Sequence, residues 1–354
     1  MKRDDRVYIK RCLGLAKKGL GMTSPNPMVG AVVVKGGEVI AEGYHKMPGQ
    51  PHAEINALNQ AGRRANGATL YLNLEPCTHY GRTPPCVDRI IEAGIRRVVC
   101  ALVDPNPLVN GKGVERVRQA GIEVIVGILE EEARRLNEVY LTYITKGLPF
   151  AILKLALSLD GRITLPDGGW ITGQEARKTG HRLRSQVDAI LVGRGTVIED
   201  DPQLTTRLAR GKDPIRIIVD SKATLPSESR VITKNKGRII LAATKLASSR
   251  RLERLKAQGV EVLIVKEKDG LVDLRALLKK LAKREITSLL VEGGAKIATS
   301  FLKERLINKV TFFISPKIIG QGGLTATTDR LPLIELSQVV YKKIGKEILV
   351  TGYM

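Results

Sequence analysis

Three residues with metal-binding side chains stand close to a glutamate in the first quarter of the chain. His52 begins a His-Ala-Glu triplet that ends at Glu54, and Cys77 and Cys86 follow in a polar, proline-rich segment. One imidazole and two thiolates can hold a tetrahedral Zn²⁺ ion and leave its fourth position to water. Zinc turns such a water into a hydroxide near neutral pH. Glu54 could then carry a proton from the water to a leaving nitrogen, so the spacing predicts hydrolytic deamination.

Each part of this pattern also has a simpler interpretation. His52 alone could be a surface or capping histidine, and the cysteine pair could hold a structural zinc ion. A structural site needs a fourth protein ligand. His79 is the candidate in this segment, because His45 and His181 belong to other segments. The complete pattern arises by chance far more rarely than its parts, so the interpretation as a deaminase is preferred.

The second half of the chain contains one weaker signal for a ligand. The run VEGGAKIATSF (291–301) predicts a strand that ends at two glycines and is followed at once by a helix. Backbone N–H groups at a helix start can bind a dinucleotide phosphate, and glycines let it come close. Such a turn is common, however, and no GxGxxG fingerprint follows the first strand of this half. The run alone does not identify a cofactor.

Hydrophobic periodicity places these residues on two successive α/β units, because strands that alternate with helices form a sheet covered on both faces. In the first unit we expect a hairpin that turns at 36–37, helices over 5–19, 52–61, 86–92, 111–120 and 129–144, and strands over 68–73, 96–102 and 122–126. After a linker at 145–150 we expect strands over 150–158, 189–193, 214–220, 238–243, 260–265, 288–294 and 309–315, helices over 173–186, 248–258, 271–283 and from 295, and a C-terminal hairpin.

Composition narrows the class of protein. A length of 354 residues favours two domains. The net charge of +22 suggests a nucleic-acid partner, but the basic residues are spread along the chain and aromatic residues make up only 4%. We therefore expect a solvated basic surface that attracts small phosphorylated substrates, without a nucleic-acid partner. No apolar run is long enough for a membrane span, and the charged N-terminus is unlike a secretory signal, so a cytoplasmic protein without a membrane partner is expected.

Longer strings in both halves resemble one enzyme family. Most zinc deaminases have the spacing PCxxC, whereas the residues THYGRTPP separate Cys77 from Cys86 here. The string EPCTHYGRTPPC, together with SPNPMVGAVVV and VDPNPLVNGKG, resembles the deaminase half of the bifunctional riboflavin-biosynthesis enzymes. KLALSLDGRI, WIT at 170–172 and GRGTVIEDDPQLTTR at 193–207 resemble their reductase half. The resemblance covers essentially the whole chain. It implies a cytidine-deaminase-like three-layer domain over 1–146 and a dihydrofolate-reductase-like α/β domain over 147–354.

The resemblance also implies the residues of two sites. In the first domain it implies zinc ligands at His52, Cys77 and Cys86, a catalytic Glu54, and substrate contacts at Asn26, His79, Arg82, Asp104 and Asn106. In the second it implies NADPH contacts at Ala156, Trp170, Thr196, Asp200, Ser221, Gly294, Ala295, Lys296, Ile297, Ala298, Thr299 and Ser300. Substrate contacts there are implied at Gly168, Arg184, Leu204, Arg207 and Glu292. Without the family, Asn26 and Asn106 would be assigned to turns beside prolines. Arg184 and Arg207 suit the substrate phosphate, but without the family they could equally be solvated surface arginines.

Three functions remain in competition at this point. The family implies deamination of a phosphorylated diaminopyrimidinone and then NADPH-dependent reduction of its ribosyl group. The first alternative is a deaminase of cytidylates or tRNA bases fused to an unrelated reductase, which a PCxxC spacing would favour. The second is a basic nucleic-acid-binding protein with a structural zinc ion. The first function is preferred because its motifs occur in both halves. A homo-oligomer is compatible with all three.

Overall fold

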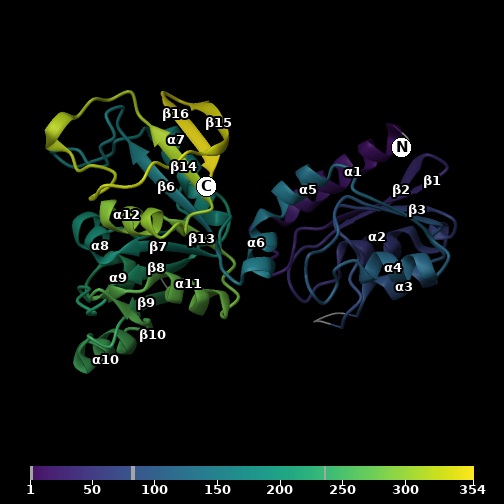
Figure 1. Ribbon diagram of the computed structural model, residues 1–354, viewed down its shortest axis with the longest axis horizontal. Helices are drawn as coiled ribbons and strands as arrows, with labels where there is room; N and C mark the ends of the chain where they lie inside the picture. The colour runs from purple at the N-terminus through teal and green to yellow at the C-terminus, as the bar shows by residue number, and fades with distance from the viewer. Residues whose placement is uncertain (1–2, 81–83, 235–236) are drawn as a thin grey trace. The chain divides into compact units, whose positions relative to one another are not determined.

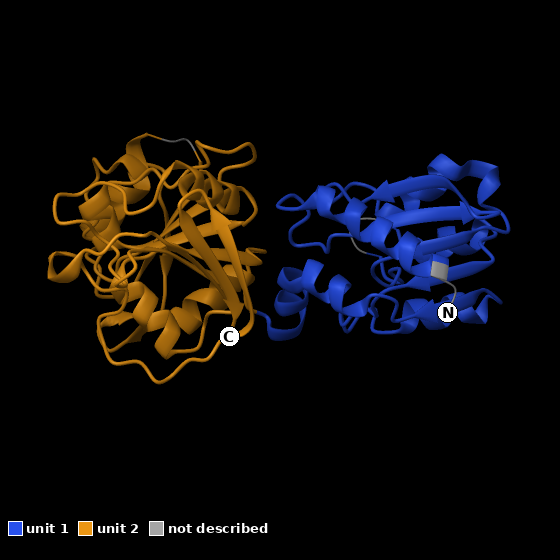
Figure 2. Cartoon of the chain, turned by 90° about the horizontal axis from the view of Figure 1, so that it is seen from above, with its two compact units in different colours: residues 1–147 blue, residues 148–354 orange. Residues whose placement is uncertain are grey.

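The computed structural model describes residues 3–80, 84–234 and 237–354. The chain divides into two compact units, residues 1–147 and 148–354 (Figure 2). Each unit has its own sheet and its own hydrophobic clusters, so each is described by itself. Among the described residues, no helix combines the length and the apolar character that crossing a membrane requires.

The sheet of the first unit mixes antiparallel and parallel strands. Its order is β2-β1-β3-β4-β5, with β1 antiparallel to both neighbours and β3, β4 and β5 parallel. The expected hairpin is confirmed: Gly36 and Gly37 have φ values of 60° and 85°, the left-handed conformation that a tight hairpin turn requires. The strands are β1 (Gly30–Lys35), β2 (Glu38–Tyr44), β3 (Thr69–Leu72), β4 (Arg97–Cys100) and β5 (Glu123–Val126).

Helices cover both faces of this sheet (Figure 1). Ala31 and Val33 of β1 pack in one cluster with α2, α3 and α4, whereas Val32 and Val34 pack in a second with α1, α5 and α6. The unit is therefore the three-layer α/β domain that the motifs predicted. Its helices are α1 (Arg3–Ala16), α2 (Ala53–Ala61), α3 (Cys86–Glu92), α4 (Lys112–Gln119), α5 (Glu130–Leu136) and α6 (Glu138–Lys146).

The second unit has a nine-stranded sheet in the order β10-β9-β8-β7-β13-β6-β14-β16-β15. In this spatial order, neighbouring strands are parallel from β10 at one edge as far as β14. The C-terminal hairpin of β15 and β16 then pairs with β14 through β16 in the antiparallel sense, as expected. The strands are β6 (Phe150–Leu157), β7 (Ala189–Gly193), β8 (Ile215–Val219), β9 (Ile239–Ala243), β10 (Glu261–Ile264), β13 (Ser288–Val291), β14 (Lys309–Ile314), β15 (Ser337–Ile344) and β16 (Glu347–Tyr353).

Helices also cover both faces of the second sheet. Leu191 of β7 packs with α11 and α12, whereas Ile190 and Val192 on its other face pack with α8, α9 and α10. The α/β fold class is thus confirmed for both halves. The helices are α7 (Gln174–Ser185), α8 (Arg194–Asp200), α9 (Arg230–Thr233), α10 (Ser249–Ala257), α11 (Leu274–Ala282) and α12 (Ala295–Lys303).

Several expected boundaries are wrong. The single helix expected over 129–144 is interrupted at Asn137, and α6 then continues to Lys146, into the segment expected to be a linker. The helix expected over 271–283 begins at Leu274, because the Asp273 side chain caps it and a small ribbon of β11 (Glu267–Lys268) and β12 (Leu271–Val272) precedes it. Helices α8 and α9 were not expected, since both are short and contain β-branched residues that favour strands.

Gly43 allows α2 to approach the sheet closely. An added Cβ would overlap the carbonyl oxygen of Ala53 and lie 2.7 Å from the nitrogen of Ala57. Gly43→Ala should therefore lower the free energy of unfolding by about 1–3 kcal/mol, as overpacking does. Gly14→Ala, in the last turn of α1 with nothing within 4 Å, should instead stabilise slightly through helix propensity. Urea denaturation of the whole chain measures the free energy of unfolding of both variants. Equal effects of the two substitutions would contradict the close packing of α2 against Gly43.

Candidate functional sites

The three sequence-predicted metal ligands converge in the first unit. Nδ1 of His52 lies 3.2 Å from Sγ of Cys86 and 3.6 Å from Sγ of Cys77, and the three ligand atoms all lie within 4.8 Å of one another. His52 directly precedes α2, Cys77 follows β3, and Cys86 begins α3, donating its backbone N–H to Cys77 Sγ at 3.3 Å. In the described ranges, no second group of three His, Cys, Asp or Glu side chains comes this close.

A buried carboxyl group lies beside these donors. Glu54, in the first turn of α2, is only 3% exposed, and its Oε2 has no hydrogen-bond partner among the described residues. Burial raises the pKa of this carboxyl group. Hydrogen bonds from Cys86, and then from His52, lower the pKa of the Cys77 thiol and favour the thiolate that binds metals. An imidazole, two sulfurs and an unsatisfied carboxyl oxygen fit a zinc ion with a water position.

One histidine outside the ligand set lies beside the same place. His45, which the sequence assigned to another segment, is 2% exposed and makes an edge contact with His52 at 5.2 Å between ring centroids. Its Nε2 lies 3.0 Å from Nδ2 of Asn26, a predicted substrate contact. His79 is not part of the ligand group, so the geometry of the described residues does not support it as a fourth structural ligand. No local pattern around His45 could have revealed this contact.

Two of the other predicted substrate residues lie together in one loop. Asp104 is 5% exposed and accepts a hydrogen bond of 2.9 Å from the backbone N–H of Asn106. Burial raises the pKa of Asp104, and its hydrogen bonds from Asn106 and Tyr140 oppose that effect. Arg82, the predicted phosphate contact, lies outside the described residues.

In the second unit, the predicted cofactor residues gather at one edge of the sheet. Ala156 is near the end of β6, Thr196 follows β7, Ser221 follows β8, and residues 294–300 follow β13. Because these strands are parallel, their carboxyl ends meet at the same edge, where α/β sheets bind ligands. Oγ1 of Thr196 accepts a hydrogen bond of 3.0 Å from the backbone N–H of Gly294, which joins two of the predicted contact segments.

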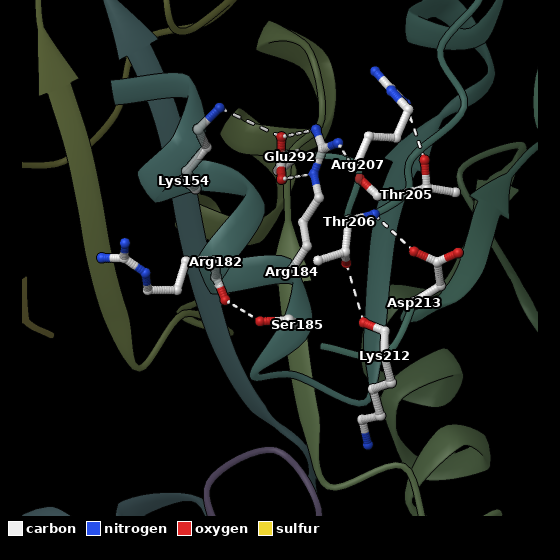
Figure 3. A network of polar contacts seen from close by, with 10 residues as sticks. All are labelled: Lys154, Arg182, Arg184, Ser185, Thr205, Thr206, Arg207, Lys212, Asp213 and Glu292. Carbon is white, nitrogen blue, oxygen red and sulfur yellow. Dashed lines mark hydrogen bonds and ion pairs between the residues drawn. The ribbon is translucent and has the colours of Figure 1, made fainter. Parts of the chain in front are cut away.

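A compact charge cluster lies at this edge (Figure 3). The guanidinium group of Arg184 donates two hydrogen bonds to the carboxylate of Glu292, at 2.8 and 2.9 Å, and a third to the backbone oxygen of Thr205. Nζ of Lys154 lies 3.4 Å from the same carboxylate. Burial alone would raise the pKa of Glu292, but Arg184 and Lys154 lower it to about 2. The carboxylate is therefore held ionised between two cations.

Sequence reasoning missed two residues of this cluster. Lys154 is the one charged residue of the strand FAILKLAL, and that interruption of an apolar run was the available signal. His181 on α7 is buried, and its Nδ1 has no hydrogen-bond partner in the described part of the chain. Burial, and then the charges of Arg184 and Arg207, lower the pKa of His181 to about 4, so its ring is neutral at pH 7.

The relatives of this chain carry both domains. Residues 149–350 match the RibD C-terminal domain, and residues 2–102 match the cytidine and deoxycytidylate deaminase zinc-binding region. The chain is 49% identical over 353 residues to the riboflavin biosynthesis protein RibD of Aquifex aeolicus, covering 98% of this chain and 97% of that one. The chain belongs to the RibD family. Its identity to Escherichia coli RibD is 39% over 357 residues, or 96% of each chain.

Solved RibD structures have the same fold over the whole length. RibD of Acinetobacter baumannii superposes with a TM-score of 0.90 at 36% identity and covers 99% of both chains. A Thermotoga maritima protein described as a diaminohydroxyphosphoribosylaminopyrimidine deaminase/5-amino-6-(5-phosphoribosylamino)uracil reductase gives 0.86 at 41% identity, covering 99% of this chain and 98% of that one. RibD is a bifunctional deaminase and reductase of riboflavin biosynthesis, and both domains are present here. The alternative of an unrelated reductase is therefore wrong.

The other predicted contacts in the RibD reductase domain differ in exposure. Trp170 is 64% exposed, and Gly168 and Arg207 are exposed as well. Asp200 is the last residue of α8. Leu204 is only 3% exposed and packs into the core, so a ligand could reach its backbone rather than its side chain.

The charge cluster predicts a pH dependence of RibD stability. The pKa of Glu292 lies below its usual value of 4.5, so the folded state favours its ionised form. The contribution of the ionised Glu292 carboxylate to the free energy of unfolding is fully present above pH 4.5 and is lost as the pH falls towards 2. Glu292→Gln should therefore be less stable than the wild type by about 3 kcal/mol near pH 6, since one pKa unit is worth about 1.4 kcal/mol. Urea denaturation should show this difference shrinking between pH 5 and pH 3. A difference that does not change with pH would contradict the ion pairing.

Proposed function

We propose that the chain catalyses two successive steps. Residues 1–146 would remove an amino group from 2,5-diamino-6-(5-phosphoribosylamino)pyrimidin-4(3H)-one by hydrolysis. Residues 147–354 would then reduce the ribosyl group of 5-amino-6-(5-phosphoribosylamino)uracil to ribityl with NADPH. The convergence of His52, Cys77 and Cys86 beside the buried Glu54 carries this proposal. It is supported by the reductase domain in the same chain and by the similarity to the Thermotoga maritima enzyme.

His52, Cys77 and Cys86 would hold the zinc ion of the deaminase. Zinc in such a site supplies a Lewis acid that lowers the pKa of a water molecule. Glu54, whose Oε2 has no protein partner among the described residues, would accept a proton from the attacking water and return it to the departing amino group. Its burial suits the first task, because burial raises the pKa of the carboxyl group and makes it a better proton acceptor.

The deaminase substrate would be bound by residues of three loops. Amide and carboxylate groups supply the donors and acceptors that the edge of a diaminopyrimidinone requires. An arginine can form charge-assisted hydrogen bonds with the ribose phosphate. The proposed contacts are Asn26, His79, Arg82, Asp104 and Asn106.

NADPH would bind along the carboxyl edge of the second sheet, where it supplies the hydride. Helix α12 begins directly after Gly294, which has no side chain to cap the first N–H groups of the helix. These groups suit a dinucleotide phosphate. Gly293 has no room for a side chain, because an added Cβ would lie 2.6 Å from the Cβ of Ile297. The proposed cofactor contacts are Ala156, Trp170, Thr196, Asp200, Ser221, Gly294, Ala295, Lys296, Ile297, Ala298, Thr299 and Ser300.

The reductase substrate would lie beside the charge cluster. Arg207 is exposed and is suited to the substrate phosphate, whereas Arg184 already holds Glu292. The neighbouring Glu292 carboxylate can accept hydrogen bonds from ribose hydroxyl groups. The proposed contacts are Gly168, Arg184, Leu204, Arg207 and Glu292.

We also propose a cytoplasmic enzyme whose ligands are small phosphorylated pyrimidines, with neither a nucleic-acid nor a membrane partner, because its basic residues form no single run.

The function is tested by supplying the diaminopyrimidinone phosphate with and without NADPH. The wild type should release ammonia in both cases and consume NADPH only after deamination. Glu54→Gln should keep its zinc and its NADPH-dependent reduction of the deaminated substrate, yet lose ammonia release by a factor of at least about 10², the lower range for general acid–base catalysis. Ammonia release by this variant at the normal rate would refute the role of Glu54. NADPH left unconsumed with the deaminated substrate would refute the reductase assignment.

The ligand assignment is tested by metal analysis. Cys77→Ser and Cys86→Ser should each lower the bound zinc well below one equivalent, because a hydroxyl group is a much poorer ligand than a thiolate. Cys12→Ser, which changes a buried cysteine outside the ligand group, is the matched control and should retain the metal. A full equivalent of zinc in either ligand variant would show that the site is elsewhere.

A further inference from the structure

The break between α5 and α6 places two buried polar side chains next to loops predicted to bind the deaminase substrate. Asn137 is 1% exposed and Tyr140 is 7% exposed. Both lie beyond residues 2–102, the part of the chain that matches the deaminase zinc-binding region. Burying polar groups is unfavourable unless they are hydrogen-bonded, so their partners indicate what these side chains do.

Tyr140 contacts the loop of Asp104 and Asn106. Its hydroxyl group donates to the Asp104 carboxylate, with Oδ1 and Oδ2 at 2.9 and 3.0 Å, and the Asn106 side chain hydrogen-bonds the same hydroxyl group. The ring of Tyr140 packs in the hydrophobic cluster with Ala133, and only its hydroxyl group is needed to reach the loop. A phenylalanine would therefore keep the core contacts and lose the contact with the substrate residues.

Asn137 contacts the other loop. Its Oδ1 accepts a hydrogen bond of 2.8 Å from the backbone N–H of Met28, and its Nδ2 donates to the Met28 carbonyl oxygen at 3.0 Å. Asn73, at the end of β3, donates to the same carbonyl oxygen at 2.9 Å. Met28 is two residues from Asn26, so these amide groups fix the backbone that carries this predicted substrate contact.

Glu75 fixes the Asp104 loop from the opposite side. Its buried carboxylate accepts backbone N–H groups of Asp104, Gly111 and Val114 at 3.1, 2.9 and 3.0 Å. The Asp104 backbone is thus held independently of Tyr140. Loss of the Tyr140 hydroxyl group should leave the loop folded while freeing the carboxylate.

We propose that Asn137 and Tyr140 are positioning residues of the deaminase, which hold the two substrate loops through Met28 and through the Asp104 and Asn106 side chains. The proposal rests on the function proposed above. Their hydrogen bonds go to Met28 and Asp104 and not to the predicted zinc ligands, so we expect an effect on substrate binding with the metal retained.

Tyr140 also affects the charge of Asp104. Among the described residues, the titratable groups that act on this carboxyl group are Tyr140 on α6, Glu75 after β3, and His79 in the lengthened loop. Burial raises the pKa of Asp104, and the Tyr140 hydroxyl group opposes this by donating to the ionised form. Removing that donor should raise the pKa further, so a reaction that needs the carboxylate should lose rate at a higher pH.

The experiment compares Tyr140→Phe with Tyr71→Phe in the full-length, zinc-loaded enzyme. Tyr71 is the matched control, because it is also buried and donates to a buried carboxylate, Asp5, at 2.9 Å without contacting either substrate loop. In Tyr140→Phe, the KM of the diaminopyrimidinone phosphate should rise about tenfold, the effect of losing one hydrogen bond to a charged group. Its kcat should change less than about twofold. The acid limb of kcat/KM should move to higher pH, with zinc content and reductase activity unchanged.

Asn137→Ala should give the same rise in KM with zinc retained, and if this variant does not fold, Tyr140→Phe decides alone. An unchanged KM and pH profile in Tyr140→Phe, or an equal change in Tyr71→Phe, would overturn the positioning role. If the wild type deaminates the substrate normally in that case, only this inference fails. If the wild type releases no ammonia, the proposed function fails as well.

Discussion

The convergence of one imidazole and two sulfurs depends on packing rather than on the ligands themselves. His52 precedes α2 and Cys86 begins α3, and both helices pack on the same face of the sheet. Cys77 comes from the loop after β3, a strand in the middle of that sheet. Gly43 allows α2 close enough for His52 to reach the sulfurs. The donor atoms can therefore meet only when two helices and a strand have their final arrangement, and local structure alone would not bring them together.

The second unit holds its charges in place by a different interaction. Glu292, Arg184 and Lys154 are largely buried, and removing such groups from water is unfavourable unless each is paired. The two hydrogen bonds from Arg184 fix the orientation of the Glu292 carboxylate, because a guanidinium group and a carboxylate match in one plane. The carboxylate is thus an oriented acceptor, which suits the proposed contact with substrate hydroxyl groups because it would not need to reorganise.

Sequence reasoning succeeded where the signal is local. The His-Ala-Glu triplet, the two cysteines and the hairpin glycines are short patterns that can be recognised by residue type and spacing, although only the glycines set their geometry locally. It failed at contacts between distant segments: His45 reaches His52 only through the fold, and Tyr140 reaches Asp104 across 36 positions. The break at Asn137 was missed because apolar spacing continues across a single residue. The side chain at the break bonds to Met28, far away in the sequence, and spacing within the helix carries no signal of that contact.

The predicted site residues of both units lie at the same kind of sheet edge, and this explains why their loops need support from other parts of the fold. Cys77 follows β3 and Asp104 follows β4, while the reductase residues follow β6, β7, β8 and β13, so all of them leave the carboxyl ends of parallel strands. At such an edge the strand hydrogen bonds end, and each loop must be held by other parts of the fold. The reductase loops hold one another, as Thr196 holds Gly294. The deaminase loops at 26 and 104 also bond to Asn137 and Tyr140, in addition to Asn73 and Glu75, which is why we assign a positioning role to Asn137 and Tyr140 even though α5 and α6 contain no predicted contact with the substrate.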